Sequence, residues 1–259
     1  MAEPLTYGSY LRIDELLTLQ RPQSDPAHHD EMLFIVIHQV YELWFKQLLH
    51  ELEAVKHHLQ SDDAIRATRA LGRVHAIQHV LEQQVDVLET MTPHEFNAFR
   101  NLLNPASGFQ SVQFRELEFL CGVGKTAYLR HLETTDEERR RLEQRLQEPT
   151  LYDELKGFLG RRGFATALSA ELLETFRRIY DGADEHTNLY VLLEAFIEFD
   201  ERFLLWRGRH VRMVERMIGQ KTGTGGSLGV RYLETTLGKK FFPELWEVRT
   251  VLGESVPAK

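Results

Sequence analysis

A histidine interrupts an otherwise apolar helical face near the end of the chain. The other members of this face recur at steps of three and four residues around His210: Phe203, Trp206, Val214 and Met217. A neutral imidazole in such a place can ligate a metal ion or a metal-containing cofactor. A lone histidine is more often a core histidine bonded to a nearby carbonyl group. The glycine-rich residues 219–229 end the helix and suit a loop that closes over a ligand.

Two other positions pair a hydrogen-bonding side chain with an aromatic one four residues earlier. Phe34 precedes His38 in the most apolar run of the chain, so the two share one helix face. His38 is either a polar core contact or a ligand-binding group in an aromatic pocket. Phe96 precedes Arg100, which either faces solvent or a carboxylate, or grips the carboxylate of a ligand. Downstream of Arg100 lie Ser107 and Gly108, two loop residues where a ligand could come close to the backbone.

Other reactive arrangements are incomplete. His75 and His79 are four residues apart, but no Glu-x-x-His pair accompanies them, so we expect partly exposed helix histidines. The sequence has no phosphate-binding P-loop and no Gly-x-Ser-x-Gly nucleophile motif. The single cysteine, Cys121, lies in an apolar run and is expected to be buried and unreactive. The mixed sequence of residues 198–203, EFDERF, indicates an ordinary helix surface.

Composition narrows the possible partners. The 259 residues are 42% hydrophobic and carry a formal net charge of -8, which gives no electrostatic case for a nucleic-acid partner. The most apolar run, residues 32–45, is too short to span a bilayer, and the N-terminus lacks the pattern of a signal peptide. One cysteine fits a reducing compartment. We therefore expect a cytoplasmic protein without a membrane partner.

The elements that must position these residues are helices. Strand signals are nearly absent, and three-four apolar periodicity recurs along the chain. Thr92-Pro93-His94-Glu95 has the pattern of a capping box with proline at the first helical position. We predict one all-α domain of bundle type over residues 1–259. The expected helices span residues 7–19, 30–60, 64–90, 92–103, 111–120, 134–146, 151–159, 169–180, 187–219, 230–237 and 244–251.

Six segments, taken together and in order, resemble the tryptophan 2,3-dioxygenase family. They are LTYGSYLRIDELL, FIVIHQVYELWFKQLLHELEAV, LETMTPHEFNAFR, NPASGFQSVQFRELEFLCG, WRGRHVRMVERMIGQKTGTGGSLGVRYL and FFPELWEVR. The resemblance implies an all-helical homotetramer, built as a dimer of dimers, with one haem b per subunit. It also implies insertion of both atoms of O2 across the indole C2–C3 bond of L-tryptophan. The product would be N-formyl-L-kynurenine, made in the first step of tryptophan degradation through kynurenine.

The resemblance also implies roles for single residues. His210, in WRGRH, matches the proximal ligand of the haem iron, which decides between the two readings of its apolar face. His38 matches the distal, catalytic histidine that accepts a hydrogen bond from the indole N–H. Phe34 matches the aromatic residue that packs on the indole ring.

Further matches concern the amino-acid end of the substrate. Arg100 matches the arginine that binds its carboxylate, and Thr224 the threonine that holds its ammonium group. Phe96 lies where some members carry a tyrosine and others a phenylalanine. Tyr7 and Tyr10 match tyrosines that reach into a neighbouring subunit's pocket, so residues 1–20 would complete another copy's site.

Two alternatives differ from this interpretation. A haem oxygenase of the same superfamily acting on another indole would keep His210 and change the pocket. A non-catalytic helical haem-binding or sensor protein would bind haem without turnover. Residues 134–169 carry no motif that the resemblance assigns.

Overall fold

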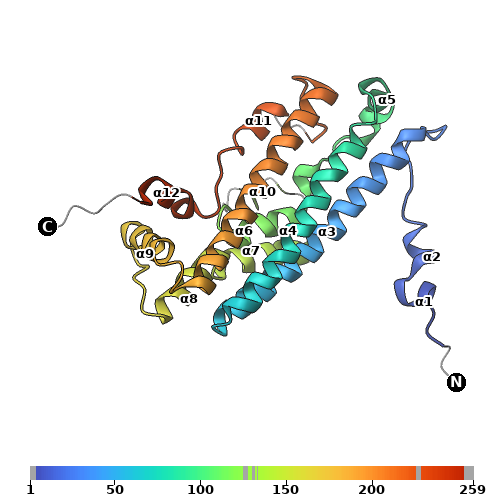
Figure 1. The fold of residues 1–259 in the computed structure, drawn as a ribbon. Helices are drawn as coiled ribbons and strands as arrows, with labels where there is room; N and C mark the ends of the chain where they lie inside the picture. The colour runs from blue at the N-terminus through green and yellow to red at the C-terminus, as the bar shows by residue number, and fades with distance from the viewer. Residues whose placement is uncertain (1–3, 125–127, 130–131, 133, 226–228, 254–259) are drawn as a thin grey trace.

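The computed structural model describes residues 4–124, 128–129, 132, 134–225 and 229–253 (Figure 1). Every regular element within these ranges is a helix, which confirms the predicted all-α class. The α-helices are α1 (Tyr7–Leu11), α2 (Ile13–Leu16), α3 (His29–Gln60), α4 (Ala64–Leu88), α5 (Pro93–Phe99), α6 (Val112–Leu120), α7 (Asp136–Gln147), α8 (Leu151–Arg161), α9 (Ser169–Asp181), α10 (Thr187–Ile218), α11 (Val230–Glu234) and α12 (Pro243–Val251). Two short 3-10 helices, η1 (Arg100–Leu103) and η2 (Gly108–Gln110), follow α5. Across the described ranges, none of these helices has both the length and the apolarity needed to cross a membrane.

Three long helices form the centre of the fold. Figure 1 shows α3, α4 and α10 lying side by side, and α4 packs against both of the others. Their three-four apolar stripes face inward, because burying those side chains together removes apolar surface from water. Fully buried members of this core include Leu48 and Leu52 of α3, Leu71 and Val74 of α4, and Phe196 of α10.

The directions of these helices bring the two ligand-type histidines to one end of the bundle. Tyr41 Oη donates to the carbonyl oxygen of Leu81 at 2.8 Å, as expected for antiparallel α3 and α4. Gln78 Nε2 donates to the carbonyl oxygen of Phe199 at 2.9 Å, within a parallel pair formed by α4 and α10. The beginning of α3 therefore meets the ends of α4 and α10. A separate apolar cluster fills this end and consists of Ile37, Val85, Leu88, Met91, Phe99, Met213 and Met217.

The predicted capping box starts α5, as the sequence indicated. The Thr92 side chain accepts from the backbone N–H of Glu95, and the Glu95 side chain accepts from the backbone N–H of Thr92. The helix ends earlier than residue 103, because the chain tightens into η1 from Arg100 onward. This change of pitch places Arg100 at the junction between the two elements.

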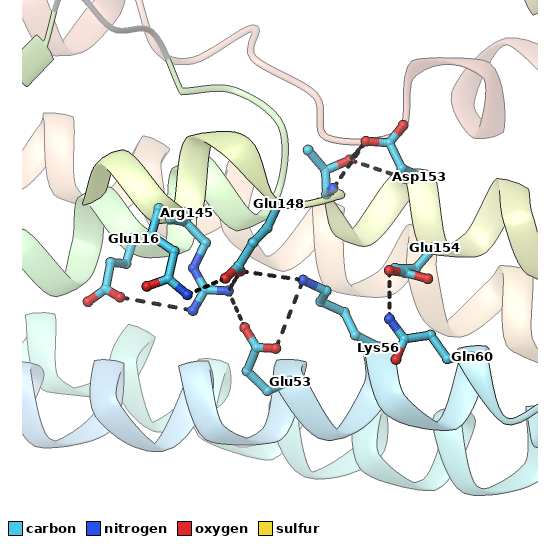
Figure 2. A network of polar contacts seen from close by, with 10 residues as sticks. Glu53, Lys56, Gln60, Glu116, Arg145, Glu148, Asp153 and Glu154 are labelled. Atoms are coloured by element: carbon cyan, nitrogen blue, oxygen red, sulfur yellow. Dashed lines mark hydrogen bonds and ion pairs between the residues drawn. The ribbon is translucent and has the colours of Figure 1, made fainter. Parts of the chain in front are cut away.

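Polar contacts attach α7 to the bundle. Figure 2 shows Arg145 of α7 next to Glu53 of α3 and Glu148, with an Arg145 Nη1 to Glu148 Oε2 distance of 2.8 Å. The buried Lys56 ammonium lies 3.9 Å from a carboxylate oxygen of each of these two glutamates. Charges taken out of water in this way need such partners. One residue of α7, Leu142, is buried.

The prediction that residues 198–203 form an ordinary helix surface is wrong for Asp200. Its side chain is 0% exposed, and Oδ2 accepts from Phe241 N at 2.9 Å, Phe242 N at 3.1 Å and Trp246 Nε1 at 3.0 Å. Burial raises the pKa of Asp200, although these three donors act in the opposite direction. The aspartate thus ties the beginning of α12 to α10. His75 is partly exposed, as predicted, and its Nε2 lies 2.9 Å from the carbonyl oxygen of Ala195.

The N-terminal segment is not the single helix expected over residues 7–19. Arg12 adopts φ 52° and ψ 44°, a left-handed conformation that ends α1 and starts α2. No residue of either helix is buried, so packing does not hold them in one continuous helix. Figure 1 shows this arm, defined here as residues 4–18, beside the bundle and not within it.

Candidate haem and substrate site

A cavity of about 620 Å³ lies at the end of the bundle where α3 begins and α10 ends. Its volume is in the usual range for small-molecule and cofactor sites. Eight of the predicted site residues line it: Phe34, His38, Phe96, Arg100, Ser107, Gly108, His210 and Thr224. The helix directions therefore bring together side chains that are far apart in the sequence. No group of three or more histidine, cysteine, aspartate or glutamate residues among those described could hold a bare metal ion.

His210 presents a neutral imidazole to the cavity. Burial lowers its pKa to about 4, and the nearby His38 acts in the same direction. The ring stacks on Trp206, one turn earlier in α10, with centroids 5.6 Å apart and planes 15° apart. No hydrogen bond to the His210 ring is found among the described residues. The imidazole is therefore neutral, oriented by its packing and not hydrogen-bonded to any described residue. These properties fit an axial ligand of haem iron.

His38 lies on α3 and is also held as a neutral imidazole. Burial lowers its pKa, and its Nδ1 lies 2.7 Å from the carbonyl oxygen of Phe34. The two rings are in contact, with centroids 4.0 Å apart. Phe34 in turn stacks on Phe96 at 5.6 Å with an interplanar angle of 25°. These rings form an aromatic wall that would pack well against a planar apolar group.

Arg100 and Thr224 connect the glycine-rich loop to the opposite wall. The Arg100 guanidinium donates to the carbonyl oxygen of Thr222, and Thr224 Oγ1 donates to the carbonyl oxygen of Ala106 at 2.6 Å. A guanidinium has five N–H donors, so this bond leaves others for a ligand. The predicted lid is described up to residue 225 and at residue 229, and its residues 226–228 lie outside the described part of the chain.

The close fit of this loop requires a glycine at one position. A Cβ built on Gly225 would lie 2.6 Å from the Cβ of Ser107, a separation that real Cβ atoms essentially never show. Gly225 therefore lets the loop backbone lie directly against Ser107 at the cavity wall. The predicted approach of a ligand to the backbone at Ser107 and Gly108 stays a prediction, and in this structure the loop lies against the Ser107 side chain.

One end of the cavity is polar, which the sequence did not predict. Arg115 of α6 and Arg207 of α10 are both buried and both pair with Glu118, the latter at 3.7 Å. Within the described residues, Arg115 Nε and Arg207 Nη2 have no hydrogen-bond partner. Buried unpartnered N–H groups are costly, so they mark a place where an anionic ligand group would be stabilised. In the sequence, Arg115 and Glu118 lie in FRELEF and Arg207 lies in WRGR, and neither stretch gives such a signal.

Tyr7 and Tyr10 do not line the cavity of their own chain. They lie on α1 and are 78% and 70% exposed, respectively. Other large apolar side chains of the same segment are exposed as well: Leu5, Leu11, Leu16 and Leu17. So much exposed apolar surface on one short segment is typical of a segment that packs against another molecule.

Comparisons with known proteins show the family of the chain. A family model described as tryptophan 2,3-dioxygenase matches residues 1–163 and 159–252. A tryptophan 2,3-dioxygenase of Nocardioides sp. is 51% identical over 253 residues, covering 96% of this chain and 95% of the relative. One from Herpetosiphon aurantiacus is 47% identical, covering 97% of this chain and 100% of the relative. One from Xanthomonas oryzae pv. oryzae is 44% identical, with 96% and 88% covered. With identity at this level over nearly the whole chain, the protein belongs to the tryptophan 2,3-dioxygenase family.

Proposed function

We propose that the chain binds haem b through His210 and oxidises L-tryptophan to N-formyl-L-kynurenine with dioxygen. The observation that carries this proposal is that one cavity holds a neutral free imidazole, His210, a second neutral imidazole, His38, and a guanidinium, Arg100. Haem, when bound, supplies the iron at which dioxygen is activated. The protein residues contribute binding, orientation and exclusion of water.

His38 and Phe34 orient the indole ring. Because the Phe34 carbonyl oxygen accepts a hydrogen bond, His38 Nδ1 carries the proton and Nε2 keeps its lone pair. Nε2 can then accept a hydrogen bond from the indole N–H, and the aromatic wall fixes the ring plane. This contact polarises the indole and aligns its C2–C3 bond, so His38 contributes through positioning. Removal of a proton by His38 is not required for this role.

Arg100 and Thr224 would hold the amino-acid end of the substrate. The remaining N–H groups of Arg100 suit a carboxylate, and the Thr224 hydroxyl oxygen can accept from an ammonium group. Arg100 also donates to the loop carbonyl of Thr222, and Thr224 of the loop donates to the carbonyl of Ala106. Substrate recognition and loop docking therefore use the same two residues, and a docked loop keeps water from the reacting atoms.

The buried arginines would anchor the cofactor. Haem b carries two propionate carboxylates, and Arg115 Nε and Arg207 Nη2 are buried N–H donors of cavity-lining residues that make no hydrogen bond within the described residues. This chemistry matches one propionate at the polar end, while the methyl- and vinyl-bearing edge suits the apolar side chains of Met213 and Val214.

We further propose a homotetrameric assembly, located in the cytoplasm, in which the arm of one copy completes the site of another. The exposed Tyr7 and Tyr10 support this role of the arm, since the described residues of their own chain leave both largely uncovered. Assemblies that contain two different variant subunits test the role of the arm. An Arg100→Ala subunit has an intact arm, and a Tyr7→Ala/Tyr10→Ala subunit has an intact pocket. If arms serve neighbouring sites, mixed assemblies will be more active than either variant alone.

The reaction itself is tested with purified, haem-loaded and reduced protein. We expect absorbance of N-formylkynurenine to appear with L-tryptophan, and both atoms of labelled dioxygen to enter the product. Turnover of another indole but not of tryptophan would favour the related oxygenase. Haem binding without any product would favour a binding or sensor protein. Either result would contradict the proposal.

A further inference from the structure

A buried carboxylate at the beginning of α3 anchors the segment that links the arm to this helix. Glu31 belongs to the first turn of α3, yet it is 0% exposed. Its oxygens accept from Gln23 N at 2.6 Å, from Ser24 N at 3.0 Å and from the Ser24 hydroxyl. Ser24 Oγ also accepts from His28 N at 2.7 Å. The carboxylate thus satisfies donors of a segment that has no helix or strand of its own.

A second contact lies two turns further along the same helix. Gln20 Nε2 donates to Gln39 Oε1 at 2.6 Å, and Gln39 Nε2 donates to the carbonyl oxygen of Leu19 at 3.2 Å. Residues 31 and 39 are separated by about 12 Å along a helix. The segment 19–28, which links the arm to α3, is therefore fixed at two points and runs antiparallel to α3. The Glu31 end is charged and buried, whereas the Gln39 bonds are between neutral, partly exposed groups.

Packing within the chain does not set the direction of the arm. Neither α1 nor α2 has a buried residue, and Figure 1 shows both lying apart from the three long helices. The fixed segment 19–28 is consequently the part of the chain that determines where Tyr7 and Tyr10 are presented. A hydrogen-bonded carboxylate is well suited to this, since each charge-assisted bond is stronger and more directional than a neutral one.

We propose that Glu31 is a positioning residue that directs the arm, and with it Tyr7 and Tyr10, toward the pocket of a second copy of the chain. This inference rests on the proposed function, because the tyrosines act there on a neighbour's substrate. Glu31 itself touches neither substrate nor cofactor. Its effect should therefore appear in substrate binding and be transmitted through the two tyrosines.

The first test is a double-variant cycle in the haem-loaded enzyme. Glu31→Ala should raise KM for L-tryptophan about fivefold, with kcat and haem content unchanged. In a Tyr7→Ala/Tyr10→Ala background, the same change should alter KM by less than about twofold, because the groups it positions are absent. Ser24→Ala, which removes one donor and little volume, should give a smaller shift in the same direction. Glu201→Ala on the exposed surface of α10 is the matched control and should have no effect.

The second measurement is amide hydrogen exchange of the full-length wild type and variants. Glu31→Ala should speed exchange in residues 19–28 and leave α4 and α10 unchanged. The proposal would be overturned if Glu31→Ala shifted KM equally in both backgrounds or left exchange of residues 19–28 unchanged. It would also be overturned if the Tyr7→Ala/Tyr10→Ala variant alone had the KM of the wild type. Failure of the proposed function is separate, since it would appear in the wild type as an absence of N-formylkynurenine.

Discussion

The imidazole Nδ1 of His38 lies 2.7 Å from the carbonyl oxygen of Phe34, one helical turn earlier. A carbonyl oxygen only accepts, so this contact places the proton on Nδ1 and leaves Nε2 as the acceptor of the ring. Burial lowers the pKa of His38 and keeps the ring neutral. The main chain of α3 thus sets the tautomer that an indole N–H requires.

Replacement of His38 should lower turnover without abolishing it. His38→Ala removes the acceptor but leaves the aromatic wall, so we expect kcat/KM to fall by about one to two orders of magnitude. Steady-state formation of N-formylkynurenine measures this. 1-Methyltryptophan, which has no indole N–H to donate, is the control substrate and should be affected much less. Complete loss of turnover with tryptophan binding intact would instead make His38 a general base.

Arg100→Ala should discriminate between substrates by their charge. A charged hydrogen bond contributes roughly 1.5–3 kcal/mol, so KM for L-tryptophan should rise about ten- to a hundredfold. Tryptamine has no carboxylate and should be affected far less. The loss of the bond to Thr222 affects both substrates equally, which makes tryptamine the internal control. An equal loss for both compounds would contradict a role in carboxylate binding.

Gly225→Ala should loosen the loop without replacing a functional side chain. The added Cβ would collide with the Cβ of Ser107, so the loop must move away from the cavity wall. We expect KM for L-tryptophan to rise about tenfold, with the haem spectrum unchanged. Gly238→Ala is the matched control, because Gly238, like Gly225, has no positive φ, but a Cβ added there meets nothing within 4 Å. A wild-type KM for Gly225→Ala would show that close docking of the loop is not needed.

Acidification should release the segment that Glu31 holds. Burial acts to raise the pKa of Glu31, but hydrogen bonds from Gln23 and Ser24 outweigh it and leave the pKa below its ordinary value of 4.5. A carboxyl group with a lowered pKa stabilises the folded state fully above 4.5, and this contribution disappears as pH falls through the lowered value. Amide exchange of residues 19–28, taken relative to the intrinsic exchange rate at each pH, should therefore accelerate below this value in the wild type. In Glu31→Gln the acceleration should be absent, and its persistence there would assign it to another group.

Local sequence patterns were sufficient for most helices and for the face that carries His210. The periodicity of α3 and α10 decides which side chains point inward, and the capping box at Thr92 acts over three residues. The break at Arg12 was missed because an apolar stripe predicts a helix only when something buries it, and α1 and α2 are exposed. There, local capping determines the structure in place of packing.

Long-range partners account for what the sequence could not indicate. The donors to Asp200 come 41, 42 and 46 residues later, so the sequence around it looks like a surface helix. Arg115 and Arg207 become cavity residues only when α6 meets α10 around Glu118. The roles of His38, Arg100 and Thr224 came from the resemblance, because spacing alone left each of them with a plain structural alternative.

Haem binding by His210→Ala is the measurement on which the proposal depends most directly. The purified variant is titrated with haem beside the wild type, and the spectrum of each complex is recorded in the ferric and ferrous states. We expect the variant to lose tight binding, and added imidazole to restore a wild-type-like spectrum by filling the place of the missing side chain. Unchanged affinity with an unchanged axial-ligand spectrum would contradict ligation by His210.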